Sequence, residues 1–126
     1  MSKISLREAT EVLLSLLRGE RTWAHVGPSY EETGHGDVAL RTNDGWVISL
    51  HTSYDELKHT AYMIAPDGRR GDESIWRPEA VAAGKIWGDP IDALGDAEFD
   101  HLERLAIAAR PASLPLEAQV RRPQRN

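Results

Sequence analysis

Two short turn signals, separated by residues that alternate between apolar and polar, constrain this chain more than any other feature. Asn-Asp-Gly occupies residues 43–45, and Asp-Gly occupies residues 67–68. These residue types tolerate positive φ at little cost, so both places favour tight hairpin connections. The alternation around them is typical of strands with one buried face. Residues 38–70 therefore predict an antiparallel meander, because parallel strands need crossovers of roughly a dozen or more residues.

Amphipathic helix patterns stand on both sides of this predicted sheet. Ser5 and Glu8 match a capping box, in which Ser5 accepts from the amide of Glu8 and the Glu8 carboxylate reaches back to the amide of Ser5. We expect a helix over 6–18 and a second helix that Asp96 caps and that ends before Pro111. Both should pack on one face of a sheet of about three to five strands, which makes the fold class α+β. Their predicted common core comprises Leu13, Leu16, Leu17, Trp46, Ile48, Leu102 and Leu105.

The remaining segments carry weaker signals. We expect residues 30–36 to form a turn-rich connection, and residues 77–88 to form an irregular loop that packs Trp76 and Trp87 on the core. Asp89 should cap a single helical turn that begins at a proline. The strands that we expect lie at about 21–26, 37–42, 46–51 and 57–64, with a possible further strand near 69–76.

Length and charge describe one acidic domain with a short basic tail. The chain has 126 residues and a formal net charge of −5. Residues 1–110 carry 12 basic and 19 acidic side chains and form the predicted domain, whereas residues 111–126 are rich in proline and arginine and are predicted to be disordered. Without an apolar run of roughly 18 residues or a signal-peptide pattern, we expect a cytoplasmic protein that does not contact membranes.

No motif in the chain predicts catalysis. Absence of cysteine excludes disulfides, a thiolate nucleophile and cysteine-bound zinc. The five histidines lack the spacing of metal ligands, and no serine stands in a Gly-x-Ser-x-Gly turn. We therefore expect no catalytic residues, no metal and no cofactor.

A cluster of aromatic and acidic residues is the candidate site. Tyrosine supplies contact area at protein interfaces, and carboxylates pair there with lysine and arginine. The acidic domain disfavours direct binding of nucleic acid, so the partner that we expect is a protein with a basic surface. We therefore expect a non-enzymatic protein-binding module, an inhibitor or regulator that occupies a basic surface of a larger complex. The predicted partner-binding residues are Tyr54, Asp55, Glu56, Asp72 and Glu73.

Two other classes of function fit the same sequence. One is an enzyme or sensor for a small ligand, with a pocket between the sheet and residues 77–88 in which His51, His59 and Asp55 supply polar groups. The other is a structural homodimer joined through an exposed sheet edge.

Several short motifs resemble a family of short pseudomonad proteins that has no assigned activity. The resemblance covers roughly Ser5 to Ala109, and its motifs are mostly turns and core positions, so it implies a shared fold without a catalytic site. This chain departs from that family in Thr52-Ser53 and in its longer arginine-rich tail. In size and charge alone, the chain is also similar to inhibitors encoded by phages and mobile elements, including anti-CRISPR proteins. The motifs are Asp44-Gly45-Trp46, Tyr54-Asp55-Glu56-Leu57, Ala65-Pro66-Asp67-Gly68-Arg69, Asp89-Pro90 and His101-Leu102-Glu103-Arg104-Leu105.

Overall fold

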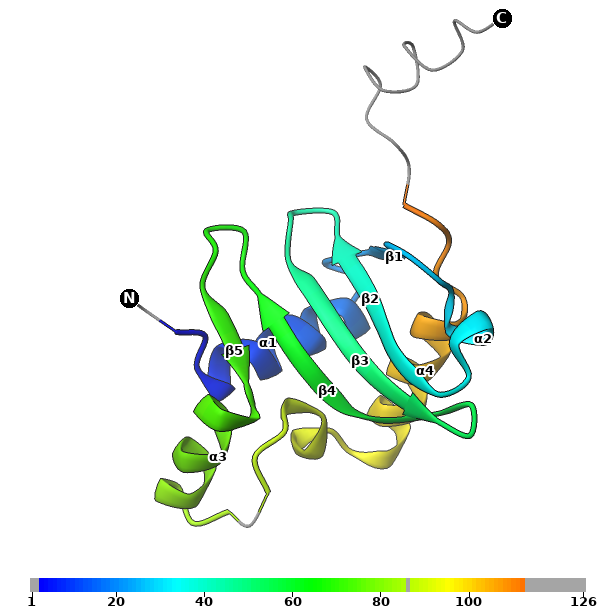
Figure 1. The fold of residues 1–126 in the computed structure, drawn as a ribbon. Coiled ribbons are helices and arrows are strands. Elements are labelled where there is room, and N and C mark those ends of the chain that lie inside the picture. Colours follow the sequence, from blue (N-terminus) through cyan, green and yellow to red (C-terminus); the bar gives the residue numbers. More distant parts are fainter. Residues whose placement is uncertain (1–2, 86, 113–126) are drawn as a thin grey trace, which may run out of the picture.

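A computed structural model describes residues 3–85 and 87–112, which form an antiparallel sheet with helices packed against it (Figure 1). The sheet has five strands in the order β1-β2-β3-β4-β5, so each strand pairs with its neighbour in sequence. This arrangement confirms the predicted α+β class. The strands are β1 (Trp23–His25), β2 (Gly36–Thr42), β3 (Val47–Ser53), β4 (Glu56–Ile64) and β5 (Arg70–Asp72). The helices are α1 (Leu6–Leu17), α2 (Tyr30–Thr33), α3 (Glu73–Ala82) and α4 (Asp96–Ile107), and η1 (Pro90–Ala93) is a 3₁₀ helix.

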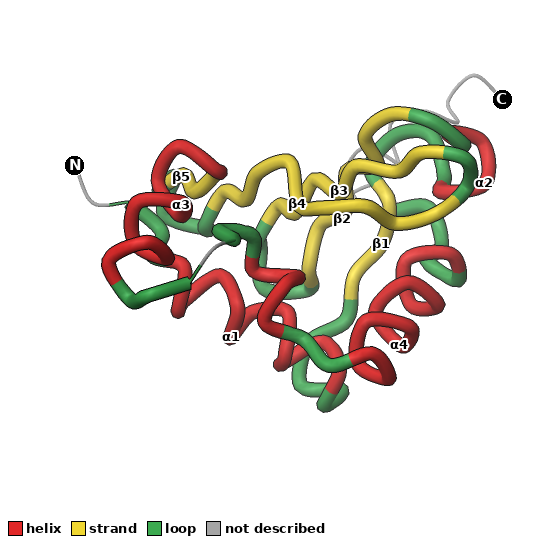
Figure 2. The backbone as a smooth tube through the Cα atoms, turned by 90° about the horizontal axis from the view of Figure 1, so that it is seen from below, coloured by secondary structure: helices red, strands yellow, loops and turns green. Residues whose placement is uncertain are grey.

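Helices α1 and α4 both lie on one side of the sheet, as Figure 2 shows. Apolar side chains from alternate positions of β2, β3 and β4 meet the apolar stripes of these helices there. All seven residues of the predicted core belong to it: five are buried, and Leu17 and Leu105 are partly buried against it. No helix of the described residues lies over the opposite side of the sheet.

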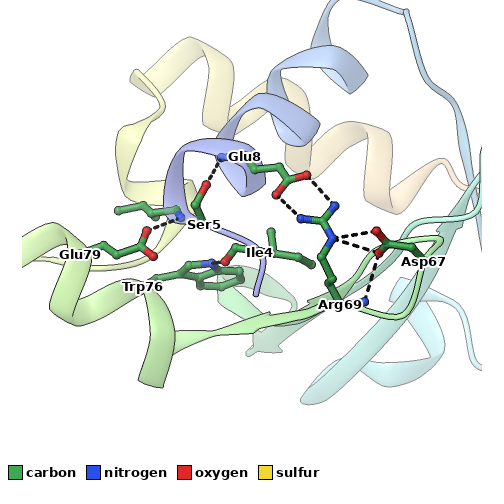
Figure 3. A network of polar contacts seen from close by, with 8 residues as sticks. Ile4, Ser5, Glu8, Asp67, Arg69, Trp76 and Glu79 are labelled. Carbon is green, nitrogen blue, oxygen red and sulfur yellow. Dashed lines mark hydrogen bonds and ion pairs between the residues drawn. The ribbon is translucent and has the colours of Figure 1, made fainter. Parts of the chain in front are cut away.

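Side chains join the start of α1 to the β4–β5 turn and to α3 (Figure 3). Ser5 caps the helix, since its Oγ accepts from the amide of Glu8 at 3.0 Å. The second half of the predicted capping box is wrong, because the Glu8 carboxylate forms two bonds of 2.8 and 2.9 Å with the guanidinium of Arg69. That guanidinium lowers the pKa of Glu8. Glu79 of α3 accepts from the amide of Leu6 at 2.7 Å, so tertiary partners complete the cap.

Two short helices replace segments predicted as irregular or extended. Residues 30–36 contain α2, which begins with a capping box between Ser29 and Glu32. The possible strand near 69–76 is limited to β5, because the side chain of Asp72 caps α3 instead. The prediction of an irregular loop over 77–88 is wrong for residues 77–82, which continue α3. Trp76 is fully buried as expected, whereas the prediction for Trp87 is wrong, since 38 % of it is exposed.

The last helix begins at Asp96, the residue predicted as its cap, so its start lies one residue earlier than expected. Gly95 holds the N-cap position, and Glu98 accepts from its amide at 2.8 Å. Of the predicted tail, Pro111 and Ala112 continue past α4 and lie beside β1, where the amide of Ala112 donates to the carbonyl of His25 at 2.9 Å. The prediction that 113–126 are disordered lies outside the described residues.

Carboxylates cover the half of β4 that β5 does not reach. Asp89 Oδ2 accepts from the amide of Thr60 at 2.9 Å, and Glu103 Oε2 accepts from the amide of Leu57 at 2.9 Å. The outer edges of β5 and β1 also have backbone partners, since Ile4 donates to Arg70 and His25 donates to Arg110. These contacts use donors and acceptors that an edge-joined homodimer needs, which counts against that hypothesis.

Candidate functional site

Two of the three hairpin turns are built on glycine. In the β2–β3 turn the amide of Thr42 donates to the carbonyl of Trp46 at 2.8 Å, and Gly45 has φ +97°. In the β4–β5 turn the amide of Ala65 donates to the carbonyl of Arg69 at 2.8 Å, and Gly68 has φ +92°. Both are three-residue loops that end in a left-handed glycine, which is a common hairpin geometry. The two turns that the sequence predicted are therefore confirmed.

The third turn, between β3 and β4, is built differently. Ser53 pairs with Glu56, so only Tyr54 and Asp55 connect the strands. Their φ angles are +55° and +63°, in the left-handed region that glycine and asparagine usually occupy. Tyr54 is 86 % exposed, the highest value among the exposed large hydrophobic side chains of the described residues. A bulky exposed residue thus occupies a backbone conformation that costs free energy, and such outliers cluster at functional sites.

Helices α2 and α4 hold this turn in place. The amide of Asp55 donates to the carbonyl of Gly34 at 2.9 Å. The buried hydroxyl of Tyr30 lies 3.2 Å from both the carbonyl of Asp55 and the carboxylate of Glu103. Burial, together with the nearby Glu103 carboxylate, raises the pKa of Tyr30 well above its usual range. The hydroxyl therefore stays protonated, and the turn presents Tyr54 on a fixed backbone.

The structure separates the predicted partner-binding residues into two groups. Tyr54, Asp55 and Glu56 lie together at the β3–β4 turn, whereas Asp72 and Glu73 lie where β5 meets α3. Because Asp72 pairs with Tyr62 of β4, the two groups are separated by six residues of strand, or about 20 Å.

The second group also has partners inside the protein. The side chain of Asp72 accepts from Ser74 and pairs with Arg70 at 3.0 Å. The hydrogen bond from the Ser74 hydroxyl is the main cause that lowers the pKa of Asp72. Glu73 pairs with Arg77 at 3.4 Å. Asp72 is therefore less available to a partner than the acids of the turn, whereas Glu73 is about as exposed as Glu56.

Further acids surround the turn. Helix α2 lies beside it in Figure 1. All five acids in this region are exposed, and one of them, Glu56, pairs with Lys58 at 3.0 Å. We call this region the acidic end, and it comprises Glu31, Glu32, Asp37, Asp55 and Glu56.

Three histidines cross the open side of the sheet next to the acidic end. His51 Nδ1 lies 2.8 Å from Asp37 Oδ1, and the ring of His51 stacks on that of His59 with centroids 4.8 Å apart. The ring of His35 meets that of His51 edge-on at 6.0 Å and that of Tyr54 at 6.3 Å. Sequence spacing did not reveal this row, because cross-strand pairing creates it.

The predicted pocket between the sheet and residues 77–88 is present as a cleft of about 390 Å³. His59 lines it, but His51 and Asp55 do not, so that part of the prediction is wrong. Their places are taken by Asp89 and Asp92, whose pKa values are both raised by burial. The sequence predicted Asp89 as a helix cap, and it does accept from the amide of Ile91 at 2.9 Å. Its burial beside β4 has no local sequence signal.

Neither a metal site nor a membrane span is found in the described part of the chain. Among residues 3–85 and 87–112, no three histidine or carboxylate side chains are grouped to hold a metal ion. The helices described for these residues are too short or too polar to cross a membrane.

This geometry defines an α+β protein with one open sheet face, a tyrosine held at an acidic end and a cleft beside β4. Residues 3–107 match the model of a family described as a domain of unknown function, DUF7693, and the chain belongs to that family. This membership agrees with the resemblance to a family without an assigned activity. No curated protein and no solved structure matches the chain.

Proposed function

We propose that this protein is a non-enzymatic protein-binding module, an inhibitor or regulator that engages a basic surface of a larger complex through Tyr54 and the acidic end. The observation that carries the proposal is the conformation of Tyr54, which is exposed at 86 % while its turn is anchored to α2 and α4. An anchored aromatic side chain loses little conformational entropy on binding, and such residues often dominate interface energies.

Charge supports the same choice of surface. At the acidic end, Glu56 pairs with Lys58, and Asp37 lies 2.8 Å from His51 Nδ1. Among the described residues, no lysine or arginine pairs with the other three acids of the acidic end, whereas Asp72 and Glu73 each pair with an arginine. Exposed carboxylates around an aromatic anchor attract a basic surface over the Debye length, which is about 8–10 Å near physiological salt. Association with such a partner should therefore be fast at low salt and slow at high salt.

The test first captures binding partners of the wild-type protein from host lysate. It then compares the association of a captured partner with two variants that carry charge reversals of equal size. Asp55→Lys with Glu56→Lys changes the acidic end, and Asp72→Lys with Glu73→Lys makes the same change in net charge about 20 Å away. For a captured partner we expect the first pair to slow association by about tenfold or more and the second by less than about twofold.

Tyr54→Ala separates the aromatic contribution from the charge. We expect it to accelerate dissociation, with a loss of affinity of about 30-fold, because truncation of a central aromatic contact typically costs about 2 kcal/mol. Equal effects of the two charge reversals, or association that is insensitive to salt, would refute the proposal.

A further inference from the structure

A cavity of about 730 Å³ lies along α1 and includes none of the residues of the acidic end. Its walls come from α1, from the end of α3 and the segment that follows it, and from Trp46 and Arg21. This volume falls within the range of about 300–1,000 Å³ that small-molecule sites occupy. The cavity therefore has the size of a ligand site, and its location is independent of the proposed partner surface.

The walls are largely apolar and include two tryptophans. Leu6 and Leu14 of α1 are only half-buried, although they lie beside a packed core. Trp87 is 38 % exposed, and its indole N–H donates to the carbonyl of Asp92 at 3.2 Å, which fixes the ring. Trp46, the residue before β3, contributes a second indole. Flat apolar walls of this kind favour an aromatic ligand.

Most charges on the walls are already satisfied within the protein. The carboxylate of Glu79 accepts from the amide of Leu6, and that of Asp89 accepts from the amides of Thr60 and Ile91. Three further wall residues form ion pairs, namely Glu8 with Arg69, Glu11 with Arg18 and Arg21 with Asp44.

Two wall residues, Arg7 and Lys85, differ from these because both are exposed cations. Within the described part of the chain, neither lies within ion-pair distance of a carboxylate. Lys85 Nζ stands 5.6 Å from the ring centroid of Trp87. A cation beside an indole provides the surroundings that a flat ring bearing one negative charge requires.

We propose that the cavity along α1 binds a small aromatic carboxylate, with its ring between the apolar walls and its carboxylate paired with Lys85. Arg7 adds a second positive charge to the walls of the same cavity. Glu8 and Glu11 of the walls pair with arginines, and the carboxylates of Glu79 and Asp89 accept from backbone amides, so the wall acids oppose such an anion less than free carboxylates would.

The test uses 2-naphthoate as the probe and the uncharged 2-naphthol as its matched comparison. We titrate each into the full chain and follow the indole N–H signals by two-dimensional NMR. Saturable 1:1 binding that shifts the signals of Trp46 and Trp87 is expected, with 2-naphthoate about 5–10-fold tighter than 2-naphthol, as one partly exposed charged contact provides.

Two variants assign the charge contact. Lys85→Gln should reduce the affinity for 2-naphthoate to that for 2-naphthol and leave 2-naphthol unchanged, whereas Lys58→Gln, at a lysine outside the cavity, should change neither. Both lysines are exposed, so both variants should fold. Absence of saturable binding at millimolar probe, shifts confined to signals other than those two indoles, or equal effects of the two lysine variants would overturn the proposal.

Discussion

The two ends of the sheet are closed by turns of opposite character. At one end, the β2–β3 and β4–β5 turns end in left-handed glycines and use their side chains for internal contacts. At the other end, the β3–β4 turn places Tyr54 and Asp55 in the same left-handed region and leaves Tyr54 in solvent. The glycine turns favour folding, whereas the β3–β4 turn lowers stability and leaves an aromatic side chain exposed to solvent. This difference is the reason why we propose the β3–β4 end, and not the glycine turns, as the binding surface.

The largest effect should come from adding a side chain to the glycine turns. For Gly45→Val we expect a loss of on the order of 2 kcal/mol in the free energy of unfolding, because a β-branched residue is strained at φ +97° and its Cβ would meet Pro66 at 3.4 Å. Gly68→Val is the control, since φ is +92° there but no atom lies within 4 Å of the added Cβ. Gly68→Val should therefore lose less free energy of unfolding than Gly45→Val, as measured by urea denaturation. Unchanged midpoints for both variants would contradict the glycine-based geometry.

A second variant tests the side-chain contacts inside the β2–β3 turn. Thr42 Oγ1 accepts from the amide of Trp46 at 2.8 Å and donates to the carboxylate of Asp44 at 2.7 Å. Thr42→Val removes both bonds and leaves a buried amide unsatisfied, so we expect a loss of about 1–2 kcal/mol in urea unfolding. Thr42→Ser keeps the hydroxyl and should recover most of this loss. If both variants lose the same stability, the hydroxyl is not the cause.

The opposite sign is expected at the β3–β4 turn. Replacing Tyr54 with Asn and Asp55 with Gly installs the pair that two-residue hairpins prefer, and we expect a gain of about 0.5–1 kcal/mol in stability. The same variant should lose capture of the partner, because it removes the exposed ring and one carboxylate. A variant that is more stable and still binds would show that the strained turn has no binding role.

The smallest effect concerns pH. The Thr42 hydroxyl and the Arg21 guanidinium lower the pKa of Asp44 below its ordinary value of 3.8. A carboxyl whose pKa is lower in the folded state contributes stability above its unfolded pKa, and this contribution is lost as pH falls through the folded value. Wild type should therefore be more stable than Asp44→Asn at pH 6, and the difference should shrink below about pH 3.8. A difference that stays constant from pH 6 to pH 3 would exclude this linkage.

Sequence reasoning succeeded where the signal was local. The glycine turns, the cap at Ser5, the apolar stripes of α1 and α4 and the cap at Asp89 all depend on residues within one or two turns of chain. The capping box of α2 is also a local signal, since Ser29 and Glu32 have the spacing that marks a helix start.

Predictions that depended on distant residues were less successful. Glu8 left its predicted cap because Arg69, far along the chain, offers two charged hydrogen bonds. Asp72 and Glu73 were grouped with Tyr54 by residue type alone, but strand pairing places them at opposite halves of β4. The cavity along α1 had no sequence signal, because its walls come from segments that meet only in the folded chain.

The sequence by itself determined the α+β class, the antiparallel meander, the two glycine turns and seven members of the core. These follow from hydrophobic periodicity and turn chemistry, which act over a few residues. Only the tertiary structure decided where the histidines meet, which acids are neutralised and which side chains line the cavity. Such features depend on strand register and helix docking, and many sequences with the same local pattern would arrange them differently.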